Sequence, residues 1–157
     1  MSKTSYMDRI MAAVSDLQSG MRVEARAALL TLWDQIEESA GPLEKCTIAH
    51  FLADTEDDVD AELQWDLRAL EAATGYDDCA DRDPVAPDLA TFLPSLHLNV
   101  GDAYRRLGDG DRAQRHAENG LRRAVALADD GYANTIKAGL DRLQSRLQNR
   151  STASQSR

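Results

Sequence analysis

The sequence predicts an all-α protein, and three observations lead to that fold class. First, the chain of 157 residues has only four prolines, at positions 42, 84, 87 and 94, which leaves long uninterrupted segments. Second, apolar residues recur in these segments at the spacing of an amphipathic helix, with almost no strand-like alternation. Third, 43% hydrophobic and 29% charged residues are ordinary for a globular domain, which argues against wholesale disorder. We therefore expect one helical domain.

Four helices are expected in the first half of the chain, each from its apolar stripe. Residues 7–17 place Met, Ile, Val and Leu on one face, and Gly20 follows as a stop signal. Residues 25–36 repeat the pattern and precede a Ser-Ala-Gly-Pro stretch. Residues 43–53 are apolar on nearly every side, which is typical of a helix covered by several neighbours, and residues 57–74 carry a leucine stripe.

Three helices are expected in the second half. The stripe over 93–107 predicts a helix that begins either at Asp88, with a bend at Pro94, or at Pro94 itself. Residues 113–128 and 132–147 carry the last two apolar stripes.

Two segments lack helical periodicity. Residues 75–90 contain several aspartates and two prolines, and this acidic loop is read as a lid, an insertion or slack chain. The polar, serine-rich segment 149–157 is expected to be a disordered tail, so the predicted folded domain is 1–148.

Charge is distributed unevenly along the chain. The total is −9, but residues 1–93 hold 7 basic and 20 acidic side chains, which is −13, whereas residues 94–157 hold 11 basic and 7 acidic, which is +4. The acidic part would repel nucleic acid, so no nucleic-acid partner is expected. No apolar run approaches the about 20 residues of a membrane span and no signal-peptide pattern opens the chain, so we expect a cytoplasmic protein without a membrane partner.

The segment 94–127 has small residues where two paired helices would approach most closely, with larger side chains beside them. The residues that make this pattern are Val100, Gly101, Tyr104, Leu107, Gly108 and Ala113. The pattern resembles the tetratricopeptide repeat, an antiparallel helical hairpin. The resemblance implies that Gly101 and Ala113 bring the two helices together while Tyr104 and Leu107 fill the adjoining gap.

Two earlier stretches fit the same register less completely. The first unit matches at Ala13, Gly20 and Ala25, and the middle unit at Ala49, Leu52 and Ala61. The resemblance therefore implies three antiparallel hairpins stacked as a short right-handed solenoid, with 132–147 as the capping helix. The alternative is a helical bundle whose small residues recur by chance.

In proteins of this kind the first helices of successive hairpins line a concave groove that holds a peptide or a partner's helix. That face would carry His50, Asp54, Leu98, Asn99, Asp102, Arg105 and Arg106 as ligand-binding residues, with Cys46 beside them and Ile10, Val14 and Leu17 on the first unit. The family's clamp for terminal carboxylates needs Lys and Asn where Cys46, His50, Leu98 and Asp102 stand, so that mode is not expected.

The preferred interpretation is a non-enzymatic module that binds a protein or peptide through this groove. One alternative is a small-molecule or metal pocket, and thus an enzyme, built from His50, Asp54 and Asp102, because histidine and carboxylates bind Zn²⁺ or act as an acid–base pair. Another is a structural homodimer that pairs through a leftover apolar face such as Ile10, Val14 and Leu17. Motifs for nucleotide binding, nucleophilic catalysis and zinc proteases are absent from the sequence, so no catalytic residue, metal or cofactor is assigned.

The other two histidines are given structural roles. His97 is expected to pack inside the fold with a hydrogen bond, and His116 to be solvated.

Overall fold

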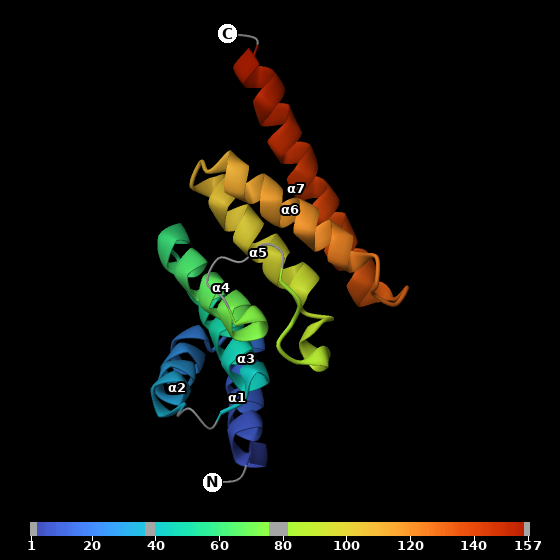
Figure 1. The fold of residues 1–157 in the computed structure, drawn as a ribbon. Coiled ribbons are helices and arrows are strands. Elements are labelled where there is room, and N and C mark those ends of the chain that lie inside the picture. The colour runs from blue at the N-terminus through green and yellow to red at the C-terminus, as the bar shows by residue number, and fades with distance from the viewer. Residues whose placement is uncertain (1–2, 37–39, 76–81, 156–157) are drawn as a thin grey trace.

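The computed structural model describes residues 3–36, 40–75 and 82–155, and within these ranges all regular secondary structure is helical (Figure 1). The expected all-α class is confirmed. In chain order the elements are α1 (Lys3–Gln18), α2 (Arg22–Gln35), α3 (Pro42–Ala53), α4 (Val59–Thr74), the short 3₁₀ helix η1 (Pro87–Leu89), α5 (Leu93–Arg106), α6 (Gly110–Ala124) and α7 (Gly131–Gln155).

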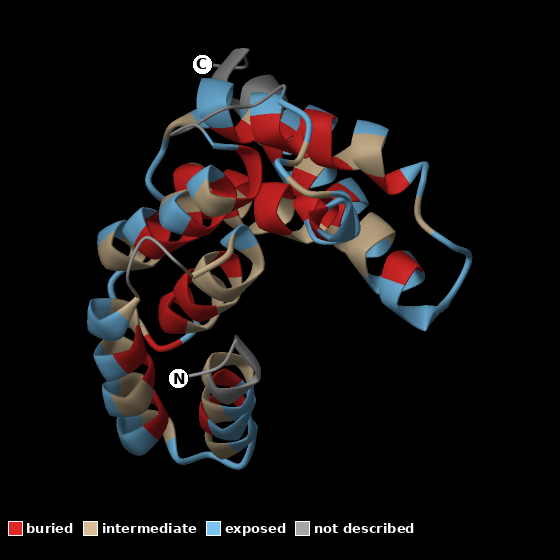
Figure 2. Ribbon diagram, turned by 60° about the horizontal axis from the view of Figure 1, so that its bottom comes forward, coloured by how far each residue is buried: buried red, intermediate tan, exposed pale blue. Residues whose placement is uncertain are grey.

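Helices that follow one another in the chain pack together. The most extensive contacts join α5 with α6 and α3 with α4; α4 with α5 and α1 with α2 follow, and α6 also packs on α7 and α2 on α3. Two alternate pairs, α1 with α3 and α5 with α7, are in contact as well. Within the described residues, α1 and α2 make no extensive contact with α5, α6 or α7. Buried residues accordingly follow the facing sides of successive helices (Figure 2).

The turns that end α1 and α5 are built alike. Gly20 and Gly108 both adopt the left-handed conformation, with φ of +88° and +87°. In each turn, the amide of the residue that follows the glycine donates to the carbonyl of the residue four positions before the glycine, at 2.9 Å. The amide of the glycine itself donates to the carbonyl of the residue three positions before it, at 3.1 Å for Gly20 and 3.0 Å for Gly108. This is the Schellman pattern, which glycine favours because it has no Cβ. Gly20 and Gly108 are the residues that the repeat register places at equivalent positions.

Aspartates cap the N-termini of α4 and α6. Asp58 accepts a hydrogen bond from the Ala61 amide at the start of α4 (3.0 Å), and Asp109 accepts one from the Arg112 amide at the start of α6 (3.0 Å). Such N-caps satisfy amides that have no partner inside the helix. Gly75, with φ of +76°, ends α4.

Small residues bring α5 and α6 close together, as the sequence predicted, and also bring both helices close to α7. A Cβ placed on Gly101 would lie 3.4 Å from the Ala113 carbonyl oxygen, 3.3 Å from the His116 Cβ and 3.0 Å from Leu143 Cδ2. On α6, a Cβ placed on Gly120 would lie 2.6 Å from Leu140 Cδ2. These contacts leave no free volume for a larger side chain at either glycine.

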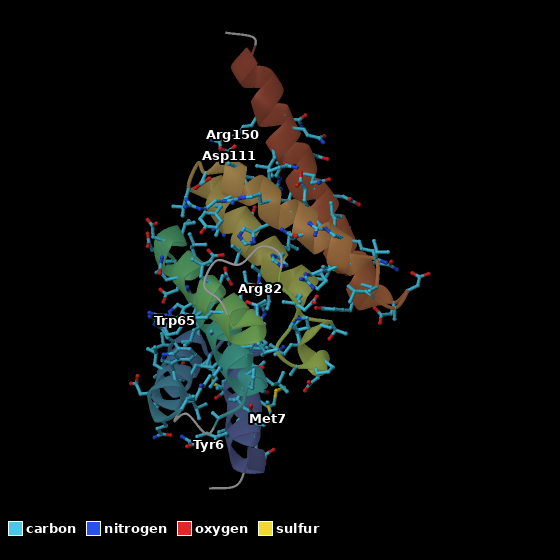
Figure 3. The ribbon with its side chains drawn as sticks, viewed as in Figure 1. Tyr6, Met7, Trp65, Arg82, Asp111 and Arg150 are labelled. Atoms are coloured by element: carbon cyan, nitrogen blue, oxygen red, sulfur yellow. The ribbon has the colours of Figure 1, made fainter. Side chains whose placement is uncertain are left out.

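Two expectations about the helices are wrong in detail. The polar tail was expected to be disordered, but α7 continues to Gln155 because no proline or glycine follows Gly139. Arg150, labelled in Figure 3, fixes part of this extension by donating to the Arg105 carbonyl at 3.1 Å. Leu107 was expected to fill a gap between helices, yet it lies in the turn after α5 and is 40% exposed.

The described part of the acidic loop is packed against the helices. Residues 76–81 of the segment predicted at 75–90 lie outside the described residues. Beyond them, the Val85 amide donates to the Ala73 carbonyl at 2.8 Å, Arg123 donates to the Arg82 carbonyl, and Leu89 of η1 is fully buried. η1 stands apart from α5, which begins at Leu93 with Pro94 in its first turn.

Candidate functional site

Two of the predicted groove residues meet across helices. His50 near the end of α3 and Asn99 on α5 are separated by 49 positions in the chain, yet Asn99 Nδ2 donates to His50 Nδ1 at 3.4 Å. Because an amide NH₂ only donates, His50 must present an unprotonated Nδ1. Burial lowers the pKa of His50 and outweighs the opposing effect of Asp54, so the ring is neutral at neutral pH.

The other predicted polar residues of α5 are tied to one another and to α4. Arg106 makes two hydrogen bonds to the Glu62 carboxylate, at 2.9 and 2.6 Å, and a third to Asp102 at 3.0 Å. Arg105 also donates to Asp102, at 3.0 Å. The hydrogen bond with Glu62 is the main cause that raises the pKa of Arg106. Arg106 therefore joins α4 to α5, and its main role is in packing of the two helices.

A buried carboxyl group lies close to this network. Asp66 on α4 is 1% exposed, and neither of its side-chain oxygens has a hydrogen-bond partner within the described residues. Burial, reinforced by Glu62 and Asp54, raises the pKa of Asp66 to about 8. Asp66 is not among the predicted site residues, although it lies one turn from Leu63 and one turn from Leu70, on the inner face of the helix.

A cavity of about 340 Å³ opens between α3, α5 and α7. We call it the aromatic pocket, because Phe51, Phe92 and Tyr132 line it and these include both phenylalanines of the chain. Phe92 and Tyr132 remain 42% and 47% exposed. The rest of the lining is Cys46, Thr47, His50, Ser95, Leu96, Asn99 and Ile136.

The aromatic pocket is suited to apolar groups and neutral hydrogen bonds. Its lining contains no Asp, Glu, Lys or Arg, His50 is neutral, and burial raises the pKa of the Cys46 thiol to about 12. A thiol with that pKa is not a nucleophile at neutral pH. His50 and Asn99 are the predicted site residues found here. The aromatic residues were missed because they come from three separate segments, α3, the turn before α5 and α7, and none belongs to a recognisable motif.

A second cavity, of about 320 Å³, lies between α5 and α7 beside the first. We call it the arginine pocket, since Arg106, Arg142 and Arg146 line it together with Glu62 and Asp102. Asn99 borders both cavities. Of the predicted residues, Leu98 and Asp102 also belong to this pocket, and the other lining residues are Gly139 and Leu143.

The remaining predicted site residues lie outside both cavities. Asp54 is an exposed residue at the C-terminus of α3, and Arg105 is occupied by Asp102. Ile10 and Val14, expected on the groove, are instead buried at 0% and 3% exposure in the core. Of the dimer face that the sequence suggested, Ile10 and Val14 are therefore already covered by the chain's own helices, whereas Leu17 is half-buried.

The suggested metal set does not assemble. Among the residues that the structure describes, no three His, Cys, Asp or Glu side chains converge closely enough to hold a metal ion. His50 is bound to Asn99, and Asp102 to Arg105 and Arg106.

The remaining histidines form a buried pair. His97 Nδ1 and His116 Nδ1 lie 3.0 Å apart, and the rings are 0% and 2% exposed. The expectation that His97 packs inside with a hydrogen bond is confirmed. The expectation that His116 is solvated is wrong, because Gly101 and Gly120 draw α6 onto α5 and cover it.

A third cavity is less informative. It has a volume of about 780 Å³ and lies beside Trp33 and Arg68. It also borders Ile36, Ala40 and Gly75, which adjoin segments outside the described residues. We assign no site to it.

Comparison with protein-family models, curated proteins and solved structures finds no match for this chain. Within the described residues, no helix combines the length and the apolar character needed to cross a bilayer.

Proposed function

We propose that this chain is a non-enzymatic, tetratricopeptide-like module that binds a peptide segment of a partner protein in the aromatic pocket. The single observation that carries the proposal is this pocket, which α3, α5 and α7 wall on three sides. In the predicted repeat, α3 and α5 are the first helices of successive hairpins and α7 is the capping helix. In a repeat of this type the first helices line the concave face, so a peptide groove is expected where the pocket lies.

Two features support the repeat architecture behind the proposal. The Schellman turns at Gly20 and Gly108 match in backbone angle and in hydrogen bonds. The packing of α1 with α3 and of α5 with α7, without extensive contact between the first hairpin and the last three helices among the described residues, favours an open array over a closed bundle.

The lining of the pocket supports a peptide as the ligand. Half-exposed aromatic rings such as Phe92 and Tyr132 offer large apolar area at small entropic cost, which is typical of protein-binding hot spots. Ser95 and Asn99 supply polar groups at the edge that can pair with a peptide backbone.

A display selection tests the proposal. Random peptides would be selected against the full chain, and the dissociation constants of the winners would be measured for the wild type, for Phe92→Ala and for Leu107→Ala. We expect Phe92→Ala to weaken binding about ten-fold. Leu107→Ala is a matched control, because Leu107 is about as exposed as Phe92 (40% against 42%) but lies at the other end of α5.

Circular dichroism would verify that both variants stay helical. Equal affinity of the wild type and Phe92→Ala, or a selection that yields no binder, would contradict the proposal.

A second candidate is a small apolar molecule in the same cavity. The volume of about 340 Å³ is sufficient for one, since small-molecule sites begin at about 300 Å³. A fragment screen that shifts the thermal midpoint of the wild type but not of Phe92→Ala would favour this candidate.

A further inference from the structure

We infer that the partner segment is acidic beside its apolar anchor: a bulky apolar side chain enters the aromatic pocket and a neighbouring Asp or Glu carboxylate is bound by Arg142 and Arg146 in the arginine pocket. This inference rests on the proposed function and names the chemistry of its ligand. Asn99 lines both cavities, so one short segment can reach both.

The arginine pocket holds more positive than negative charge. Its lining has three guanidinium groups, on Arg106, Arg142 and Arg146, and two carboxylates, on Glu62 and Asp102. Both carboxylates are satisfied by Arg106, which is within 3.0 Å of each. Among the described residues, neither Arg142 nor Arg146 takes part in an ion pair, so these two charges are available to a ligand.

The positions of the two arginines favour one shared anion. Arg142 and Arg146 are four residues apart on α7, so they lie on one face of the helix and repel each other. A carboxylate between them relieves that repulsion, and a guanidinium can bind it with two parallel hydrogen bonds. α7 is held close to α5 at this point, because a Cβ on Gly139 would lie 2.8 Å from Leu98 Cδ2.

An acidic partner is the opposite of what the net charge of the whole molecule favours. A net charge of −9 favours basic peptides in general. A preference for acidic peptides would therefore come from the local arrangement of charges on α5 and α7. Whether the selected peptides are acidic or basic thus distinguishes the local arrangement from the net charge.

The experiment uses the full chain and the peptides selected above. We expect those peptides to place Asp or Glu within a few residues of a bulky apolar side chain. For the tightest one, replacing its acidic residues by Gln should weaken binding about five-fold and replacing them by Lys should weaken it further. Raising the salt concentration should weaken the binding of the acidic peptide and leave the affinity of the Gln version nearly unchanged.

Variants of the chain locate the effect. Arg142→Glu and Arg146→Glu should each weaken the binding of the acidic peptide about ten-fold and leave the affinity of the Gln version unaffected. Arg115→Glu on α6 is the matched control, since Arg115 is an exposed arginine outside both pockets. Amidated and free C-terminal forms of each peptide distinguish a side-chain carboxylate from a terminal one, and we expect amidation to have no effect.

The possible failures are distinguishable. If the selected peptides carry no acidic residues, or bind Arg142→Glu and Arg146→Glu as tightly as the wild type, the acidic partner is wrong while the pocket stands. If Phe92→Ala binds every peptide normally, the proposed function itself is wrong.

Discussion

Helix α5 packs on α6 through small and neutral groups, whereas it meets α4 through carboxylates and arginines. On the α6 side, Gly101 and Ala113 allow close approach, and His97 pairs with His116 at 3.0 Å. On the α4 side, Arg106 bridges to Glu62 at 2.6 and 2.9 Å, and Asp66 is buried without a hydrogen-bond partner in the described part of the chain.

The difference shows that the contact of α5 with α6 and the contact of α5 with α4 depend on different physical terms. The α5–α6 contact depends on shape, since any added atom meets a neighbour. The α4–α5 contact depends on protonation, since Asp66 avoids the cost of a buried charge only while its carboxyl group is neutral. The first contact should be sensitive to side-chain volume and the second to alkaline pH.

The largest expected effect comes from volume at Gly101. In Gly101→Val the Cβ would lie 3.0 Å from Leu143 Cδ2 and 3.3 Å from the His116 Cβ, and two further methyl groups would have no space. We expect the free energy of unfolding to fall by about 3 kcal/mol. Gly110→Val is the control, because a Cβ on Gly110 meets nothing within 4 Å, and its effect should stay within about 0.5 kcal/mol.

Urea denaturation followed by circular dichroism gives both values. Equal losses in the two variants would show that the α5–α6 contact is not limited by shape.

The helices were predictable because their signals are local. Apolar spacing, together with Gly20, Gly75 and Gly108 as stops, marks most helix ends within a few residues. The approach of Gly101 to Ala113 was predictable for a related reason, since small residues at a fixed separation reveal where two backbones come together. The Leu107 prediction failed because the turn that ends α5 carries this residue out of the interface.

The candidate site was only partly predictable, because a cavity depends on which helices meet. His50 and Asn99 could be placed on one face from the repeat register, and the structure brings them together. Phe51, Phe92 and Tyr132 carry no common spacing, so the sequence gives no sign that they line one cavity. Asp66 was detectable as a charged residue within an apolar stripe, which is a signal of buried polar chemistry.

The second largest effect should separate the two contacts by pH. The folded pKa of Asp66 is about 8, above the unfolded value of about 3.9. Its contribution to stability is therefore complete below the unfolded pKa and is lost as the pH rises through the folded pKa. Between about pH 6 and about pH 8 the wild type should lose about 2 kcal/mol relative to Asp66→Asn.

Asp60→Asn, at an exposed position of the same helix, should follow the wild type. Urea titrations at both pH values give the comparison. If the free energies of unfolding of the wild type and Asp66→Asn differ by the same amount at both pH values, Asp66 is ionised in the folded protein and the prediction is wrong.

The smallest effect has the opposite sign and belongs to the α5–α6 contact. Burial, followed by the influence of His116, lowers the folded pKa of His97 to about 3, below the unfolded value of about 6.5. The unfolded chain therefore takes up the proton first, and stability is lost as the pH falls below the unfolded value. From about pH 6.5 to about pH 5.5 the wild type should lose about 1 kcal/mol relative to His97→Gln.

Because Asp66 acts in the opposite direction over this range, the difference in unfolding free energy between the wild type and His97→Gln is the quantity to measure. Asp66→Asn serves as the control and should keep the full acid sensitivity; if it loses that sensitivity as well, the two contacts titrate as one unit and the comparison fails.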